Sequence, residues 1–175
     1  MTRDDKMNTK QLVFAALCTA LGVALPSFLH FIPNAGNVLL PMHLPVLLCG
    51  FLCAWPYALL CGVLTPVLSF LLLNMPTAAS LPPMVAELAL YGAIPALLSP
   101  RIRAKASAAQ VLFPLIMAML AGRLAGGLLK AFIFRAGAYS LQIWLTASFI
   151  TGIPGILAQL VIVPMLVLLL RRVKL

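Results

Sequence analysis

The feature that most limits how this chain can fold is a series of long apolar stretches, each near the length that crosses a lipid bilayer. About 20 apolar residues in an α-helix span the hydrocarbon core. The stretches cover about residues 11–29, 36–54, 57–73, 82–99, 108–131 and 141–170. Hydrophobic residues make up 63% of the 175 residues and charged residues 9%, so a water-soluble fold would expose one continuous apolar surface. The sequence therefore predicts an all-α integral membrane protein with a single membrane domain over residues 1–175.

The basic residues predict how the helices are oriented. They lie mainly in three groups at the ends of apolar stretches: Arg3, Lys6 and Lys10; Arg101, Arg103 and Lys105; Arg171, Arg172 and Lys174. Cytoplasmic loops carry an excess of Lys and Arg, so all three groups are expected on the cytoplasmic side, with residues 1–10 as a cytoplasmic tail. This requires the last stretch to cross once, with a bend near residues 152–155, and gives six transmembrane helices with both termini cytoplasmic. The formal charge of +9 thus indicates membrane orientation and not nucleic-acid binding.

Three acidic or basic residues (Glu, Arg and Lys) interrupt the apolar stretches. Arg123 and Lys130 are seven residues apart, close to two helical turns, and therefore project from one face of a helix. Glu87 is the only acidic residue outside the N-terminal tail. In the predicted topology Glu87 and Arg123 lie at similar depth in the outer half of the membrane, where an ionisable residue indicates a functional site. They are expected to form an ion pair, to line one pocket, or both, whereas Lys130 alone fits either the pocket or the outer headgroups.

The sequence lacks the patterns of the common catalytic sites. No lysine follows a Gly-x-x-x-x-Gly pattern, so the chain has no Walker A loop for ATP hydrolysis. It also has no His-Glu-x-x-His pattern and, outside the N-terminal tail, no carboxylate pair for Mg²⁺. The four cysteines all fall inside apolar stretches and are expected to be buried thiols, and no metal or cofactor site is expected. The chain is therefore predicted to bind a molecule and not to be an enzyme.

The first apolar stretch carries a stripe of small residues. Ala16, Ala20 and Ala24 recur at four-residue spacing and form one helix face. A stripe of small residues lets another transmembrane helix approach closely. The partner helix belongs either to this chain or to another membrane protein, and the spacing is compatible with both.

Several short motifs resemble one family of membrane proteins. They are PMHLPVLLCG at 41–50, WPY at 55–57, LTP at 64–66, ELALYG at 87–92, MLAGR at 119–123, and GIPG at 152–155 followed by Gln159. In this order, and over nearly the whole chain, they resemble the substrate-binding S components of energy-coupling factor (ECF) vitamin transporters. The similarity is to the branch with riboflavin-, pantothenate- and pyridoxine-type S components.

The resemblance implies a function and partners. Such S components lie in the bacterial cytoplasmic membrane, bind a water-soluble vitamin or precursor from outside, and associate with a transmembrane coupling subunit and two cytoplasmic ATPases. It also implies that the stripe Ala16, Ala20 and Ala24 docks on the coupling subunit. The ligand site would be formed by the first outer loop and the outer ends of helices four to six. On this chain those positions are Asn34, Asn37, His43, Glu87, Tyr91, Arg123 and Lys130.

The charges of the candidate site residues do not identify the ligand. One acid and two bases favour an anionic or zwitterionic ligand such as pantothenate, because a guanidinium pairs bidentately with a carboxylate or phosphate. Glu87 equally well neutralises Arg123, which would leave a neutral pocket for pyridoxine or riboflavin. Two other classes of protein share this size and hydrophobicity, a six-helix membrane scaffold without transport activity and a small carrier that works without ATPases.

Overall fold

The computed structural model describes residues 9–29, 38–99, 108–134, 146 and 150–172. This part of the chain forms six helices: α1 (Thr9–Leu29), α3 (His43–Leu52), α4 (Trp55–Leu73), α5 (Leu81–Leu98), α6 (Ala108–Phe134) and α8 (Ile153–Arg172). Within the described residues there is no β-strand. Five of the helices are long and apolar enough to cross a membrane, and α3 is the shorter one. The prediction of an all-α, six-helix membrane bundle is confirmed.

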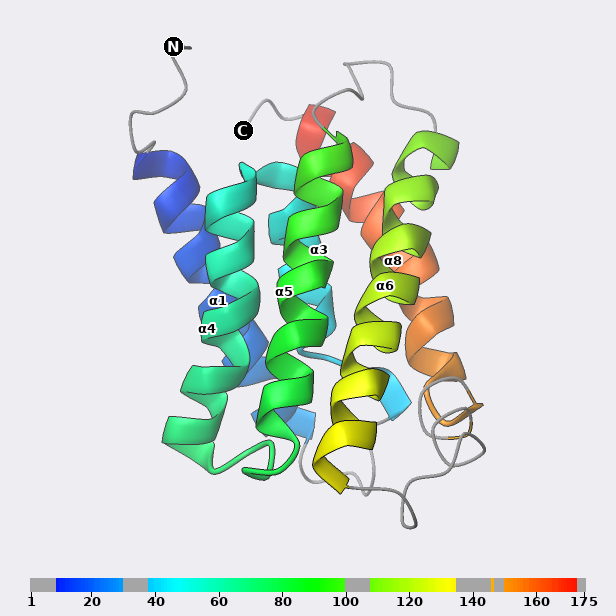
Figure 1. The fold of residues 1–175 in the computed structure, drawn as a ribbon. Helices are drawn as coiled ribbons and strands as arrows, with labels where there is room; N and C mark the ends of the chain where they lie inside the picture. The colour runs from blue at the N-terminus through cyan, green and yellow to red at the C-terminus, as the bar shows by residue number, and fades with distance from the viewer. Residues whose placement is uncertain (1–8, 30–37, 100–107, 135–145, 147–149, 173–175) are drawn as a thin grey trace, which may run out of the picture.

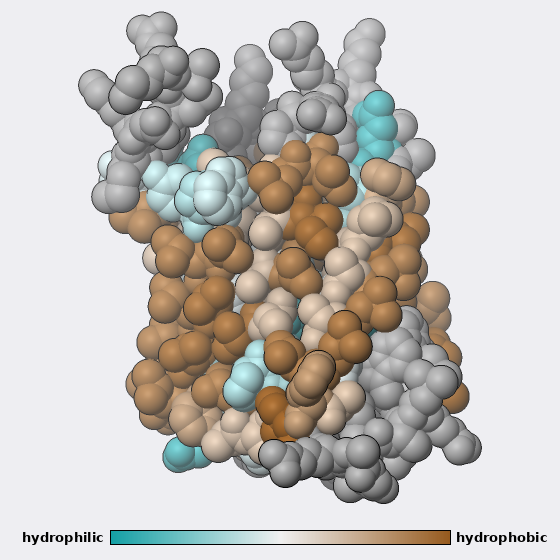
Figure 2. All heavy atoms as spheres, in the orientation of Figure 1, coloured by the Kyte–Doolittle hydropathy of each residue, from teal (hydrophilic) through white to brown (hydrophobic). Residues whose placement is uncertain are grey.

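The helices lie roughly parallel or antiparallel to one another and form a bundle (Figure 1). The start of α1, the end of α5, the start of α6 and the end of α8 all lie at the same end, drawn at the top. Lys10 near the start of α1, and Arg171 and Arg172 at the end of α8, therefore lie at this end, which the positive-inside rule assigns to the cytoplasm. We call it the inner end, and the opposite end the outer end. Hydrophobic side chains cover the middle of the face drawn in Figure 2, as a helix bundle in contact with lipid requires.

The second apolar stretch forms a shorter helix than its hydropathy indicates. Val38 and Leu39 are helical, but Leu40 takes a left-handed conformation with a φ of 50°, and α3 begins only at His43. Ten residues rise about 15 Å, roughly half the thickness of the hydrocarbon core. The first residue of α3 therefore lies inside the bundle, and His43 is only 3% exposed.

Glycines bring α3, α4 and α5 into backbone contact. A Cβ atom at Gly62 would overlap the carbonyl oxygen of Leu88, and a Cβ atom at Gly92 would overlap that of Ala58. Gly50 in turn lies against the backbone of Gly92. Helices in lipid have no hydrophobic driving force between them, so close contact through small residues is their main packing device. These three helices form the centre of the bundle.

Two further glycine contacts attach α6 and α8 to this centre. Gly122 of α6 lies under the ring of Tyr91, with no room for a Cβ atom. A Cβ atom built on Gly155 of α8 would lie 2.7 Å from the carbonyl oxygen of Val38 and 2.9 Å from that of Leu39. Gly155 begins a buried stripe on α8 that continues through Gln159, Val163 and Val167. The helix α8 packs against α3 and α6.

Candidate ligand-binding site

Polar side chains from three helices meet inside the bundle. His43 at the start of α3 places its Nε2 atom 3.6 Å from the Oε1 atom of Glu87 on α5. The Tyr91 ring, one turn further along α5, packs edge-on against the imidazole at a centroid distance of 5.1 Å. His43 is 3% exposed, Tyr91 is fully buried, and the Glu87 side chain is 14% exposed. We call His43, Glu87, Tyr91 and Arg123 the central polar cluster.

Arg123 enters the cluster from α6. Its side chain is 5% exposed, and its positive charge, together with that of Lys130, acts on the Glu87 carboxylate. The Tyr91 side chain interacts with both Glu87 and Arg123, although its hydroxyl has a well-formed hydrogen bond to neither. The structure thus pairs Glu87 with His43 and sets Arg123 close by. From the sequence, Arg123 was the expected partner of the carboxylate, and His43 was placed in the same site only by the family resemblance.

The small residues of α6 allow this arrangement. Gly122 faces Tyr91, and a Cβ atom built on Gly126 would lie 3.2 Å from the Oε2 atom of Glu87. Because both positions lack a side chain, α6 approaches α5 closely enough to bring Arg123, which lies between them in sequence, into the cluster. Lys130 lies one turn beyond Gly126, half-buried, toward the outer end of α6.

Several buried polar atoms inside the bundle lack a hydrogen-bond partner. Among the described residues these include both imidazole nitrogens of His43, the hydroxyls of Ser69 and Tyr91, and both amide atoms of Gln159. An unpaired polar group in a low-dielectric interior is destabilising, so native proteins keep few of them without a reason. A bound polar molecule would supply the missing partners.

Gln159 was not selected as a site residue from the sequence. It is fully buried on α8, and it is the only polar side chain in that helix before the C-terminal arginines. The sequence could have indicated Gln159, because a single polar residue in an apolar helix marks either a contact with another helix or a contact with a ligand. Asn34 and Asn37, which were selected, lie outside the described residues.

The small-residue stripe of α1 faces outward. Ala16 and Ala20 are exposed and Ala24 is half-buried. With side chains of α4 they line an open groove of about 530 Å³. The other lining residues are almost all apolar: Leu12, Ala15, Thr19, Val23, Tyr57, Leu60, Cys61, Leu64, Leu68 and Leu72. We call this the α1–α4 groove.

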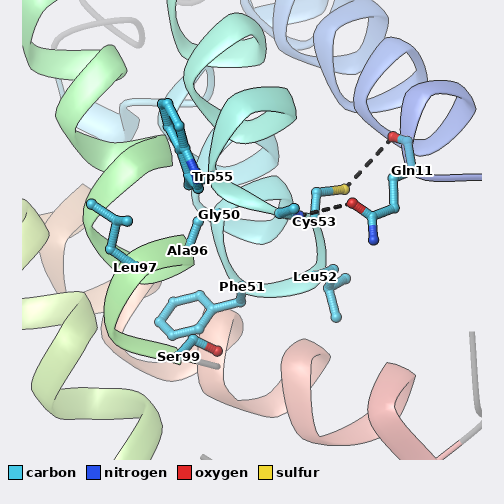
Figure 3. A pocket seen from close by; sticks show the side chains of 10 residues that line it. Gln11, Gly50, Phe51, Leu52, Cys53, Trp55, Ala96, Leu97 and Ser99 are labelled. Carbon is cyan, nitrogen blue, oxygen red and sulfur yellow. Dashed lines mark hydrogen bonds between the residues drawn. The ribbon is translucent and has the colours of Figure 1, made fainter. Parts of the chain in front are cut away.

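A second pocket of about 410 Å³ lies at the inner end, where α1 begins and α5 ends (Figure 3). The Gln11 side-chain oxygen accepts a hydrogen bond from the backbone N–H of Ala54 at 3.0 Å and so attaches α1 to the link between α3 and α4. Phe51, Trp55 and Leu97 are among the residues that line the pocket. It contains none of the residues predicted to bind a ligand.

Comparison with known proteins identifies the family. The model of the family described as the ECF transporter, substrate-specific component, matches residues 10–167. No curated protein and no solved structure matches the chain. The matched region contains all six helices up to the last turns of α8, and with them the central polar cluster and the α1–α4 groove. The chain belongs to the family of substrate-specific components of ECF transporters and is a multi-pass membrane protein.

Proposed function

We propose that this chain captures a small water-soluble vitamin or vitamin precursor from the outer side of the membrane, in a site built around the central polar cluster. The observation that carries the proposal is the set of buried polar groups inside a bundle whose surface is otherwise hydrocarbon. Charged and hydrogen-bonding groups at membrane depth mark substrate sites, because they destabilise a bundle that has no use for them. The family match also favours a substrate-binding subunit over a membrane scaffold.

The proposed partners follow from the family and from what the chain exposes. As a substrate-specific component of an ECF transporter, the chain is expected to act with a transmembrane coupling subunit and two cytoplasmic ATPases, and its own sequence has no Walker A loop. The α1–α4 groove supports a docking role for Ala16, Ala20 and Ala24, because two of these residues are exposed and all three line the groove. A transmembrane helix packs closely against such a surface of small residues.

Ligand binding is expected to raise the thermal stability of the purified chain. A molecule that binds only the folded state stabilises it by roughly 2.7 kcal/mol at a concentration 100 times its Kd. We therefore expect one of riboflavin, pantothenate or pyridoxine to raise the melting temperature in mild detergent at micromolar concentration. An absence of any shift with all three compounds would contradict the proposed function in this form.

The Ala20→Leu variant is expected to lose assembly with the coupling subunit while it keeps ligand binding. A leucine side chain at this exposed position would fill the α1–α4 groove, and it lies on a helix outside the central polar cluster. Assembly is measured by co-purification with the coupling subunit and the ATPases. Ala131→Leu makes the same change at an exposed position of α6 and should leave assembly intact. The reverse pattern, normal assembly with lost ligand binding, would exclude the groove as the docking face.

A further inference from the structure

The buried amide of Gln159 has no structural explanation within the bundle. Its side chain has no exposed surface, and among the described residues neither its oxygen nor its nitrogen has a hydrogen-bond partner. Glutamine in a transmembrane helix normally bonds across to a neighbouring helix. Here that contact is missing, so the amide is destabilising where it stands. The three other buried positions of its stripe are Gly155, Val163 and Val167, which are apolar.

The packing of α8 sets the depth of Gln159. Gly155 lies against the backbone of Val38 and Leu39, so α8 and the segment that leads into α3 are in register at that point. Gln159 lies about one helical turn further inward on α8, and His43, the first residue of α3, follows Leu39 by four residues in the same inward direction. The helix α8 packs against α3 and α6, which carry His43 and Arg123. Gln159 therefore faces the side of the bundle that holds the central polar cluster.

The unpaired groups near this depth share one chemical property. The amide of Gln159 and the hydroxyl of Tyr91 each combine a donor with an acceptor, and both groups are uncharged. The Glu87 carboxylate already has His43 as its ion-pair partner. Lys130 lies further toward the outer end. Beside the charged side chains of Glu87 and Arg123, the deep part of the site thus offers uncharged hydrogen-bonding groups at Gln159 and Tyr91.

We propose that Gln159 selects the ligand by pairing with an uncharged edge that carries an N–H donor beside a C=O acceptor, as in a lactam or ureide ring. A primary amide presents its own oxygen and N–H side by side, so such an edge satisfies both atoms through two hydrogen bonds. The inference rests on the proposed function and narrows it. Of the three candidate compounds, riboflavin has this edge, in the pyrimidine part of its ring. Pantothenate has a secondary amide with its donor and acceptor on opposite sides, and pyridoxine has no lactam.

The Gln159→Met variant tests this with two readouts that move in opposite directions. Methionine has a similar shape without hydrogen-bonding groups, so it removes an unpaired buried amide and should raise the melting temperature of the ligand-free protein. The same variant should bind riboflavin at least about 100-fold more weakly, because sites built around hydrogen bonds strongly reject a mismatched partner. Leu157→Met, which introduces methionine at an exposed position of the same helix, should change neither quantity. Riboflavin methylated at the N3 atom should lose affinity for the wild-type chain to a similar extent.

The outcomes separate this inference from the proposed function. Stabilisation of the wild-type chain by pantothenate or pyridoxine, and not by riboflavin, would overturn the role of Gln159 and leave the proposed function standing. Riboflavin binding that is unchanged in Gln159→Met, or a lower melting temperature of the ligand-free variant, would show that Gln159 is a packing residue. No binding of any of the three compounds to the wild-type chain would contradict both.

Discussion

Gly62→Ala is expected to destabilise the bundle more than any other single-methyl change described here. A Cβ atom at this position overlaps the carbonyl oxygen of Leu88, and its next neighbours are the Leu88 carbonyl carbon and the Cα atom of Ala89. These are all backbone atoms of α5, so relief requires the whole helix to move. Overpacking typically destabilises by about 1–3 kcal/mol, and we expect the upper part of that range because no side chain can rotate away.

The measurement is the melting temperature of the purified variant in detergent, with Gly126→Ala as the matched control. Both changes replace a helical glycine by alanine and gain about 1 kcal/mol of helix propensity. At Gly126, however, the nearest atoms to the new Cβ are 3.2 Å and 3.3 Å away, a tight contact that a small shift relieves, so a smaller loss of stability is expected than at Gly62. Equal melting temperatures for the two variants would mean that α4 and α5 are not in backbone contact at Gly62.

Arg123→Ala is expected to abolish ligand binding and to leave assembly with the coupling subunit intact. The guanidinium is 5% exposed inside the bundle, close to Glu87 and Tyr91. Removing it takes a buried cation away from a site whose carboxylate then has only His43 and the more distant Lys130 nearby. A loss of at least about 100-fold in affinity is expected, since truncating one member of a buried, hydrogen-bonded charge pair typically weakens binding by 2–5 kcal/mol.

Binding of the compound that stabilises the wild-type chain is measured by calorimetric titration, and assembly by co-purification. Arg123→Lys keeps the charge but loses the planar fork of donors, so an intermediate affinity is expected if the guanidinium contacts the ligand. The melting temperature of each ligand-free variant shows whether it is folded. Wild-type affinity in folded Arg123→Ala would mean that Arg123 serves only as a structural partner in the cluster.

Hydropathy indicated the apolar helices but not the length of α3, which is shorter than its apolar stretch for a local reason. The apolar stretch at 36–54 has the composition of a full crossing, but Leu40 adopts a positive φ and α3 starts at His43. Hydropathy measures how well a segment partitions into lipid and is insensitive to the backbone angles of one residue. The two prolines at 41 and 45 showed that the helix began in this region but not at which residue it began.

The sequence was sufficient to assign the polar residues to helix faces and approximate depths in the membrane. It was not sufficient to predict which of these residues contact one another. Helical spacing places Arg123 and Lys130 on one face of α6, and the topology places Glu87 at a similar depth. The partner of Glu87 depends on how α3 is positioned relative to α5, which is fixed by Gly50 and Gly92 in backbone contact. That contact brings His43 to the carboxylate. Periodicity within one helix contains no information about such an offset between two helices.

For the alanine stripe too, the sequence predicts the helix face but not the helix that packs beside it. Its spacing predicts a face that a helix can approach, and Ala16 and Ala20 are indeed exposed on α1. The other wall of the groove consists of Leu60, Leu64 and neighbouring residues of α4. The sequence alone did not show that α4 would flank this face without covering it.

The open α1–α4 groove has a consequence for how this subunit would assemble in a membrane. While the subunit is alone, a groove of about 530 Å³ with apolar walls faces the bilayer, and acyl chains fill it. A helix that docks there must displace those chains, so association is an exchange of lipid for protein. Its equilibrium then depends on how well the acyl chains of the host membrane pack into the groove. The same pair of subunits would associate with different strength in bilayers of different chain length and saturation.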